Sequence, residues 1–196
     1  MVWYPLTKLM LTMLLAFSAF PLDHWQVDKL LKMMHRTALL SAETMLARLT
    51  PLKPILCVVA QTSSYYGLAV SDAYLGSARP LPSVASLHDL EEACWAENAG
   101  ALTLALPLSG DVPTAENIRD GLYYKLLHDD RLNARIPLLT TINDPMSLTE
   151  ARREAQANVE LWEAIDLDDP SPSRDAAVAL NSFLWKHTGG WRNTFG

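Results

Sequence analysis

Cysteine is scarce in this sequence. Only Cys57 and Cys94 occur among the 196 residues, too few for a disulfide framework or for a site with four thiolate ligands. Cys57 lies in an apolar run and Cys94 in an expected helix, so both are interpreted as small buried hydrophobic residues. A disulfide between them stays open, because it depends on whether that helix packs on that run.

Signatures of nucleotide binding and catalysis are also missing. The sequence has neither the glycine-rich turn of dinucleotide-binding domains nor a phosphate-binding P-loop. It has no nucleophile elbow, no HExxH zinc motif and no CxxC pair. The five histidines are scattered singly, and none lies at metal-ligand spacing from a cysteine. We therefore expect no metal site of these types and no cofactor.

Charge is modest and its balance is acidic. Charged residues make up 19% of the chain and the net charge is −6, which argues against the broad basic surface of a nucleic-acid-binding protein. Residues 1–60 nevertheless carry a net charge of +3, and the remainder carries −9. A basic amphipathic region on a membrane surface or an acidic partner fits this asymmetry, and so does an ordinary solvated helix face.

The uncharged apolar run from Leu9 to Phe20 is shorter than the roughly 20 residues of a membrane span. Lys8 precedes it, and the small residues Ala16 and Ser18 lie near its end, a pattern typical of a secretory signal. Three interpretations stay open: a retained helix that packs on a partner, an anchor, or a signal. We divide the chain into this segment, residues 1–22, and a single domain, residues 23–196. Unless residues 1–20 direct export or membrane association, the expected location is the cytoplasm.

Helical and strand-like patterns alternate along the rest of the chain. Three short apolar runs, 55–60, 101–106 and 135–142, predict strands buried on both faces. Helix-start signals separate these runs, at Ser86–Asp89 and Pro113, and two more follow the last run, at Ser147–Glu150 and Pro172. Strands that alternate with helices favour parallel pairing, so the predicted fold is α/β. Its sheet would have three to four mostly parallel strands, with helices on both faces and a helical N-terminal extension.

Residues 61–86 are ambiguous. Residues 65–70 fit either the second strand of a hairpin or the start of a short helix. Gly76, Pro80 and Pro82 follow, and such punctuation predicts a loop.

Polar residues follow each of the three predicted strands: Ser63, Ser64, Ser109, Asp111, Asn143 and Asp144. Because the carboxyl ends of parallel strands meet at one edge of a sheet, we expect these residues to line one crevice. Asp111 and Asp144 are the candidate general bases or metal ligands, and Ser109 is a third catalytic candidate. Ser63, Ser64 and Asn143 are the candidate ligand-binding residues. The same residue types are also what turns and helix caps require.

Six tryptophans are many for this length, and Trp3, Trp25 and Trp191 are candidate partner contacts, with core filling as the alternative. The first functional hypothesis is a non-catalytic interaction or assembly subunit. It would dock on a protein partner or a second copy through its apolar N-terminal helices, with a membrane surface as a further contact and no nucleic acid. The alternative is a small hydrolase or transferase, or a ligand-binding domain, that uses the strand-end crevice.

Overall fold

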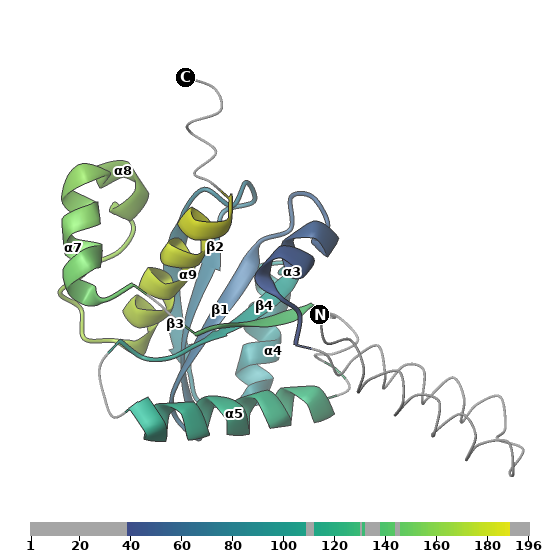
Figure 1. Cartoon of the computed structure of the whole chain (residues 1–196). Coiled ribbons are helices and arrows are strands. Elements are labelled where there is room, and N and C mark those ends of the chain that lie inside the picture. Colours follow the sequence, from purple (N-terminus) through teal and green to yellow (C-terminus); the bar gives the residue numbers. More distant parts are fainter. Residues whose placement is uncertain (1–38, 109–111, 130, 132–137, 144–145, 189–196) are drawn as a thin grey trace, which may run out of the picture. The chain divides into compact units, whose positions relative to one another are not determined.

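The computed structural model describes residues 39–108, 112–129, 131, 138–143 and 146–188 (Figure 1). They belong to one compact unit that begins at Leu39. The elements in chain order are α3 (Ala42–Arg48), β1 (Ile55–Thr62), β2 (Tyr65–Ser71), β3 (Ala78–Val84), α4 (Leu87–Ala96), β4 (Ala101–Ala105), α5 (Val112–His128), β5 (Leu139–Ile142), α7 (Leu148–Ala157), α8 (Val159–Trp162) and α9 (Pro172–Thr188). The segment 1–22, its boundary at residue 23, and the candidates Trp3, Trp25 and Trp191 lie outside the described residues.

The five strands form one mixed sheet in the order β3-β2-β1-β4-β5. The predicted strands are β1, β4 and β5, which lie side by side and run parallel. The α/β class is thus confirmed, whereas the expected size of three to four mostly parallel strands is wrong. The ambiguous residues 65–70 form β2, which pairs with β1 as an antiparallel hairpin, and β3 pairs antiparallel with β2.

Strand β3 occupies residues that the sequence predicted to be a loop. Its two prolines, Pro80 and Pro82, cannot donate backbone hydrogen bonds to a neighbouring strand. The strand lies at the edge of the sheet, where one side needs no partner, and prolines are tolerated there. The predicted loop is therefore wrong, and the two prolines instead indicate a strand at the edge of the sheet.

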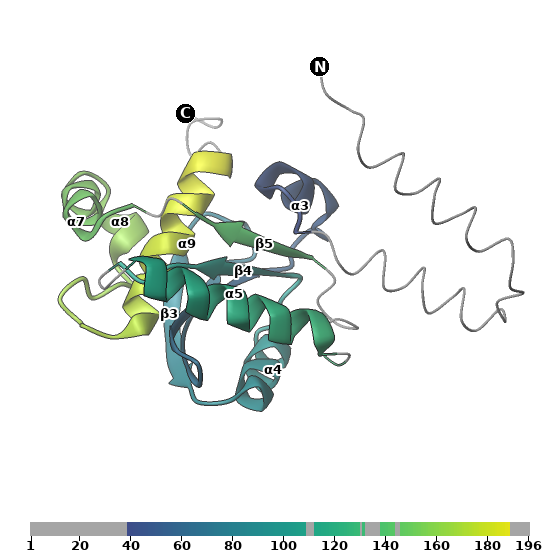
Figure 2. The ribbon, with the colours of Figure 1, turned by 60° about the horizontal axis from the view of Figure 1, so that its bottom comes forward.

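The sheet divides the core into two layers, and β1 contributes side chains to both. Its residues Ile55, Cys57 and Val59 pack in one cluster with α9 and α3, while the alternate residues pack in the other with α4 and α5. Figure 2 shows the sheet nearly edge-on, with α3 and α9 on one side and α4 and α5 on the other. Burial on both faces explains why β1 reads as one continuous apolar run.

Helix α9 is buried from Pro172 to Asn181, and two of its polar side chains accept hydrogen bonds from the backbone of the sheet. The Ser173 hydroxyl accepts the Leu68 backbone N–H at 3.1 Å, and the Asn181 Oδ1 accepts the Ala78 N–H at 2.6 Å. The pairing of β2 with β3 is irregular between Tyr66 and Leu68. Side chains of α9 therefore satisfy strand N–H groups that would otherwise be costly to bury.

Two predicted helix starts are confirmed. The Ser86 hydroxyl accepts the Asp89 N–H at the start of α4, and the Ser147 hydroxyl accepts the Glu150 N–H at the start of α7. The Glu150 carboxylate accepts hydrogen bonds from the Ser147 hydroxyl and backbone N–H in return. These bonds lower the pKa of Glu150 below its ordinary value, because they stabilise the ionised carboxylate.

Within the described part of the chain, every helix is too short or too polar to traverse a lipid bilayer.

Candidate functional site

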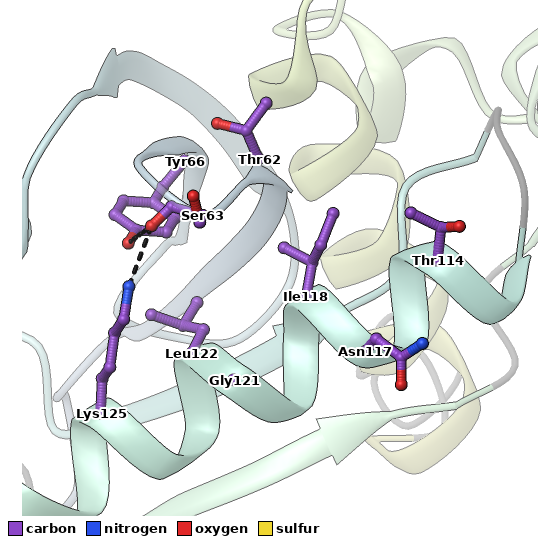
Figure 3. Close-up of a pocket in the computed structure, with 9 residues that line it drawn as sticks. All are labelled: Thr62, Ser63, Tyr66, Thr114, Asn117, Ile118, Gly121, Leu122 and Lys125. Atoms are coloured by element: carbon purple, nitrogen blue, oxygen red, sulfur yellow. Dashed lines mark hydrogen bonds between the residues drawn. The ribbon is translucent and has the colours of Figure 1, made fainter.

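A cavity of about 310 Å³ lies between the β1–β2 turn and α5 (Figure 3). It is lined from the hairpin by Thr62, Ser63 and Tyr66, and from α5 by Thr114, Asn117, Ile118, Gly121, Leu122 and Lys125. The α5 residues recur at intervals of three and four positions, which places them along one stripe of the helix. The cavity thus follows from one face of α5 lying across from the end of β1.

The turn between β1 and β2 is tied to α5 at the Ser63 carbonyl. This oxygen accepts the Tyr66 hydroxyl at 2.8 Å and the Lys125 ammonium at 3.0 Å. Burial raises the pKa of the Tyr66 phenol, so the hydroxyl keeps its proton and remains a donor near neutral pH. The position of the turn is therefore set by one bond within the hairpin and one from the helix.

The described lining of the cavity carries positive charge and no negative charge. Among the nine described residues around the cavity, Lys125 carries the single charge, and none has a carboxylate. Thr62 and Ser63 line the cavity from the hairpin, and the apolar side chains of Ile118 and Leu122 line it from α5 (Figure 3). Such a lining favours a ligand that combines an anionic group with an apolar or flat part.

The cavity lies at the carboxyl end of β1, the strand at which the sheet stops growing on one side and continues on the other. From β1 the chain runs to β2 and β3 on one side, and it later returns to place β4 and β5 on the other side. In open α/β sheets, loops diverge at the carboxyl end of the strand where this happens, and ligands bind there. Thr62 and Ser63 are the residues at that end of β1.

Of the predicted ligand-binding residues, Ser63 lines the cavity and the other two do not. Ser64 is exposed, and its N–H donates to the Thr62 hydroxyl at 3.3 Å. Asn143 is also exposed after β5 and accepts Arg119 of α5 at 3.1 Å. Ser64 and Asn143 therefore do not line this cavity, and their role in ligand binding stays a prediction. The catalytic candidates Ser109, Asp111 and Asp144 lie outside the described residues and stay predictions.

Most of the cavity was missed from the sequence. Gly121 and Lys125 looked like ordinary positions of an amphipathic helix, and a glycine in the middle of that helix was the one available signal. The buried pair Arg174–Asp175 was missed as well. Its Asp175 Oδ2 accepts the Leu108 N–H at 3.0 Å, just after β4, which fixes the start of the connection to α5.

No group of three or more His, Cys, Asp or Glu side chains is arranged to hold a metal ion among the residues that the structure describes.

The two cysteines are free thiols on opposite faces of the sheet. Cys57 packs beneath α9, while Cys94 belongs to α4 on the other side, so the open question of a disulfide is answered against one. Burial raises the pKa of each thiol to about 12. We expect neither to react with a thiol-specific disulfide reagent near pH 8 in the folded protein, because the thiolate is the reactive form.

Counting reacted thiols with and without denaturant checks this expectation. Both should react once the chain is unfolded. Rapid reaction of either thiol in the folded chain would contradict the burial described here.

The comparisons with known proteins are sparse. No protein-family model matches the sequence, and no curated protein matches it. Among solved structures, one of T. thermophilus RuvC in complex with a Holliday junction substrate is similar, with a TM-score of 0.47 and 14% sequence identity. The match covers 70% of this chain and 97% of that chain. At this distance it assigns no activity to this chain.

The RuvC comparison contradicts two expectations from the sequence. We expected a non-catalytic interaction or assembly subunit, docked through its N-terminal helices, and we expected no nucleic-acid partner. The similar structure is instead that of a protein bound to a Holliday junction substrate. The first expectation rested on missing motifs and on the apolar N-terminal segment. The second rested on net charge, which averages over a surface whose local patches can differ in sign. Neither expectation is retained.

Proposed function

We propose that the chain binds a small phosphorylated ligand in the cavity between the β1–β2 turn and α5. The observation that carries this proposal is the Lys125 ammonium at the rim of a cavity whose other described lining residues are uncharged. An ammonium group has three N–H donors, and one of them goes to the Ser63 carbonyl. Within the described residues this is its one hydrogen bond, so the remaining donors are available to an anion placed beside Lys125.

Hydroxyl groups at the end of β1 complement this charge. The Thr62 oxygen accepts the Ser64 N–H, which leaves its own proton free to be donated. Thr62 and Ser63 belong to the same turn as the carbonyl that Lys125 contacts. A phosphate beside Lys125 would therefore lie next to neutral donors, a combination that orients the group as well as attracting it.

The size of the cavity limits the ligand. Small-molecule sites span about 300–1,000 Å³, and this cavity, at about 310 Å³, is at the lower end. It suits a single phosphorylated metabolite or one nucleotide unit.

Lys125→Met tests the proposal. Charge-assisted hydrogen bonds contribute about 1.5–3 kcal/mol, so we expect the variant to bind about tenfold more weakly or worse. Isothermal titration calorimetry of the full chain with inorganic phosphate, glycerol 3-phosphate, ribose 5-phosphate and adenosine monophosphate measures the effect. Binding by the unmodified chain should weaken as salt is added, and binding by the variant should lose most of that salt dependence.

Two further variants are the controls. Lys125→Arg keeps the charge and should retain most of the affinity. Lys186→Met removes an exposed lysine from the last turn of α9, away from the cavity, and should bind as the unmodified chain does. Failure of the unmodified chain to bind any of the four phosphates would overturn the proposal, and so would an equal loss in Lys186→Met.

A further inference from the structure

Gly121 is an unexplained glycine in the middle of a helix. It lies well inside α5, which runs for 17 residues from Val112 to His128. Glycine is less favourable than alanine in a helix interior, because it loses more conformational freedom on folding. A glycine at such a position calls for a reason in its surroundings.

Protein packing supplies that reason for two other glycines but not for this one. A Cβ added at Gly67 would overlap the backbone of Pro172, and one added at Gly100 would lie 2.5 Å from the Lys53 Cβ. A Cβ added at Gly121 meets no atom within 4 Å among the described residues. The space in front of Gly121 is instead part of the cavity.

The neighbours of Gly121 border this gap, which is a recess in the wall of the cavity. Ile118 and Leu122 extend from α5 toward the hairpin on either side of it (Figure 3). Tyr66 lines the cavity from the strand side. Where a glycine leaves the helix backbone uncovered, a planar group can approach more closely than any side chain would allow.

Building on the proposed ligand site, we propose that Gly121 is a specificity-determining residue that admits the ring of a ring-bearing phosphate ester. Gly121 and Lys125 are one helical turn apart, about 6 Å along the axis. A ring on the Gly121 backbone therefore leaves an attached phosphate within reach of the Lys125 ammonium. Phosphates without a ring use Lys125 and the hydroxyls of Thr62 and Ser63, and they do not depend on Gly121.

Gly121→Ala separates this role from a structural one. The added methyl group has open space, so the variant should unfold at a temperature a few degrees higher than the unmodified chain. The same methyl group occupies the recess, so ribose 5-phosphate and adenosine monophosphate should bind about tenfold more weakly. Binding of glycerol 3-phosphate and inorganic phosphate should be unchanged. Thermal unfolding and isothermal titration calorimetry give the two readouts.

The pattern of losses identifies the ring. A loss for both ring-bearing probes places the sugar at Gly121, and a loss for adenosine monophosphate alone places the base there. Gly76→Ala is the matched control, because Gly76 lies in the β2–β3 turn and does not line the cavity; it should bind all probes normally. If the unmodified chain binds phosphates and Gly121→Ala binds the ring-bearing ones equally well, this inference is overturned while the phosphate site stands. If the unmodified chain binds no phosphate, the site itself is refuted.

Discussion

Gly67→Ala is expected to lower the free energy of unfolding by about 3 kcal/mol or more, enough to leave much of a marginally stable domain unfolded. A Cβ at this position would overlap the carbonyl group of Pro172 and lie 2.5 Å from the Ser173 nitrogen. Both obstacles are backbone atoms at the start of a buried helix, so neither can turn aside as a flexible side chain would. Strand β2 and α9 would have to separate.

Separation of β2 from α9 would lower the free energy of unfolding further, because it disrupts a hydrogen bond between them. The bond from the Leu68 N–H to the Ser173 hydroxyl lies next to the clash, and it would lengthen or break. An unsatisfied buried N–H costs about 1–3 kcal/mol. The effect should therefore reach beyond the one added methyl group and weaken the whole packing of α9 on the sheet.

Denaturant unfolding followed by circular dichroism measures the change. Gly76→Ala serves here as the comparison. Its added Cβ would lie 3.2 Å from the end of the Asp72 side chain in an exposed turn, so we expect a much smaller loss. If Gly67→Ala were as stable as the unmodified chain, the close approach of β2 and α9 described here would be wrong.

Asp175→Leu is the second change with a large expected effect. Asp175 and Arg174 are both buried, with side-chain exposures of 6% and 9%. The Asp175 carboxylate accepts the Arg174 Nε at 2.9 Å and Nη2 at 2.5 Å, and it also accepts the Leu108 N–H at 3.0 Å. Removal of the carboxylate leaves a buried guanidinium without its counter-charge, which typically costs about 3–5 kcal/mol.

A double-mutant cycle shows whether the pair acts as a unit. Arg174→Met combined with Asp175→Leu removes both charges, and we expect it to be clearly more stable than Asp175→Leu alone. Unfolding free energies of the two single variants, the double variant and the unmodified chain complete the cycle. Additive losses would show that Arg174 and Asp175 do not depend on each other.

Asp175→Asn addresses the bond to Leu108. The amide has nearly the same shape and its oxygen can still accept the Leu108 N–H, so this bond should survive while the charge is lost. We expect a stability between that of Asp175→Leu and that of the unmodified chain.

Local elements of this protein could be read from the sequence because their signals are local. The hydroxyls of Ser86 and Ser147 accept the N–H groups three residues later, so four consecutive residues carry the information for a helix start. The apolar runs that became β1 and β4 are buried on both faces, and continuous hydrophobicity is enough to predict that. Pro172 likewise begins α9 as predicted.

Other features depended on the position of an element in the sheet. The segment with Pro80 and Pro82 is acceptable as a strand because it lies at an edge, and edge position is not encoded within the segment itself. Cys57 and Cys94 are a second case, because their sequence environments did not show whether they form a disulfide. Only their placement on opposite faces of the sheet excludes one.

The sequence by itself determined the helix starts, the buried strands and the α/β class, because each depends on residues within a few positions of one another. Tertiary structure alone decided the mixed sheet, the cavity and the position of the Lys125 ammonium beside it. Lys125 lies 62 positions from the Ser63 carbonyl that it contacts, and Asp175 lies 67 positions from Leu108. Neither contact leaves a periodic or short-range trace in the chain, because it exists only once the sheet has brought α5 and α9 to their places.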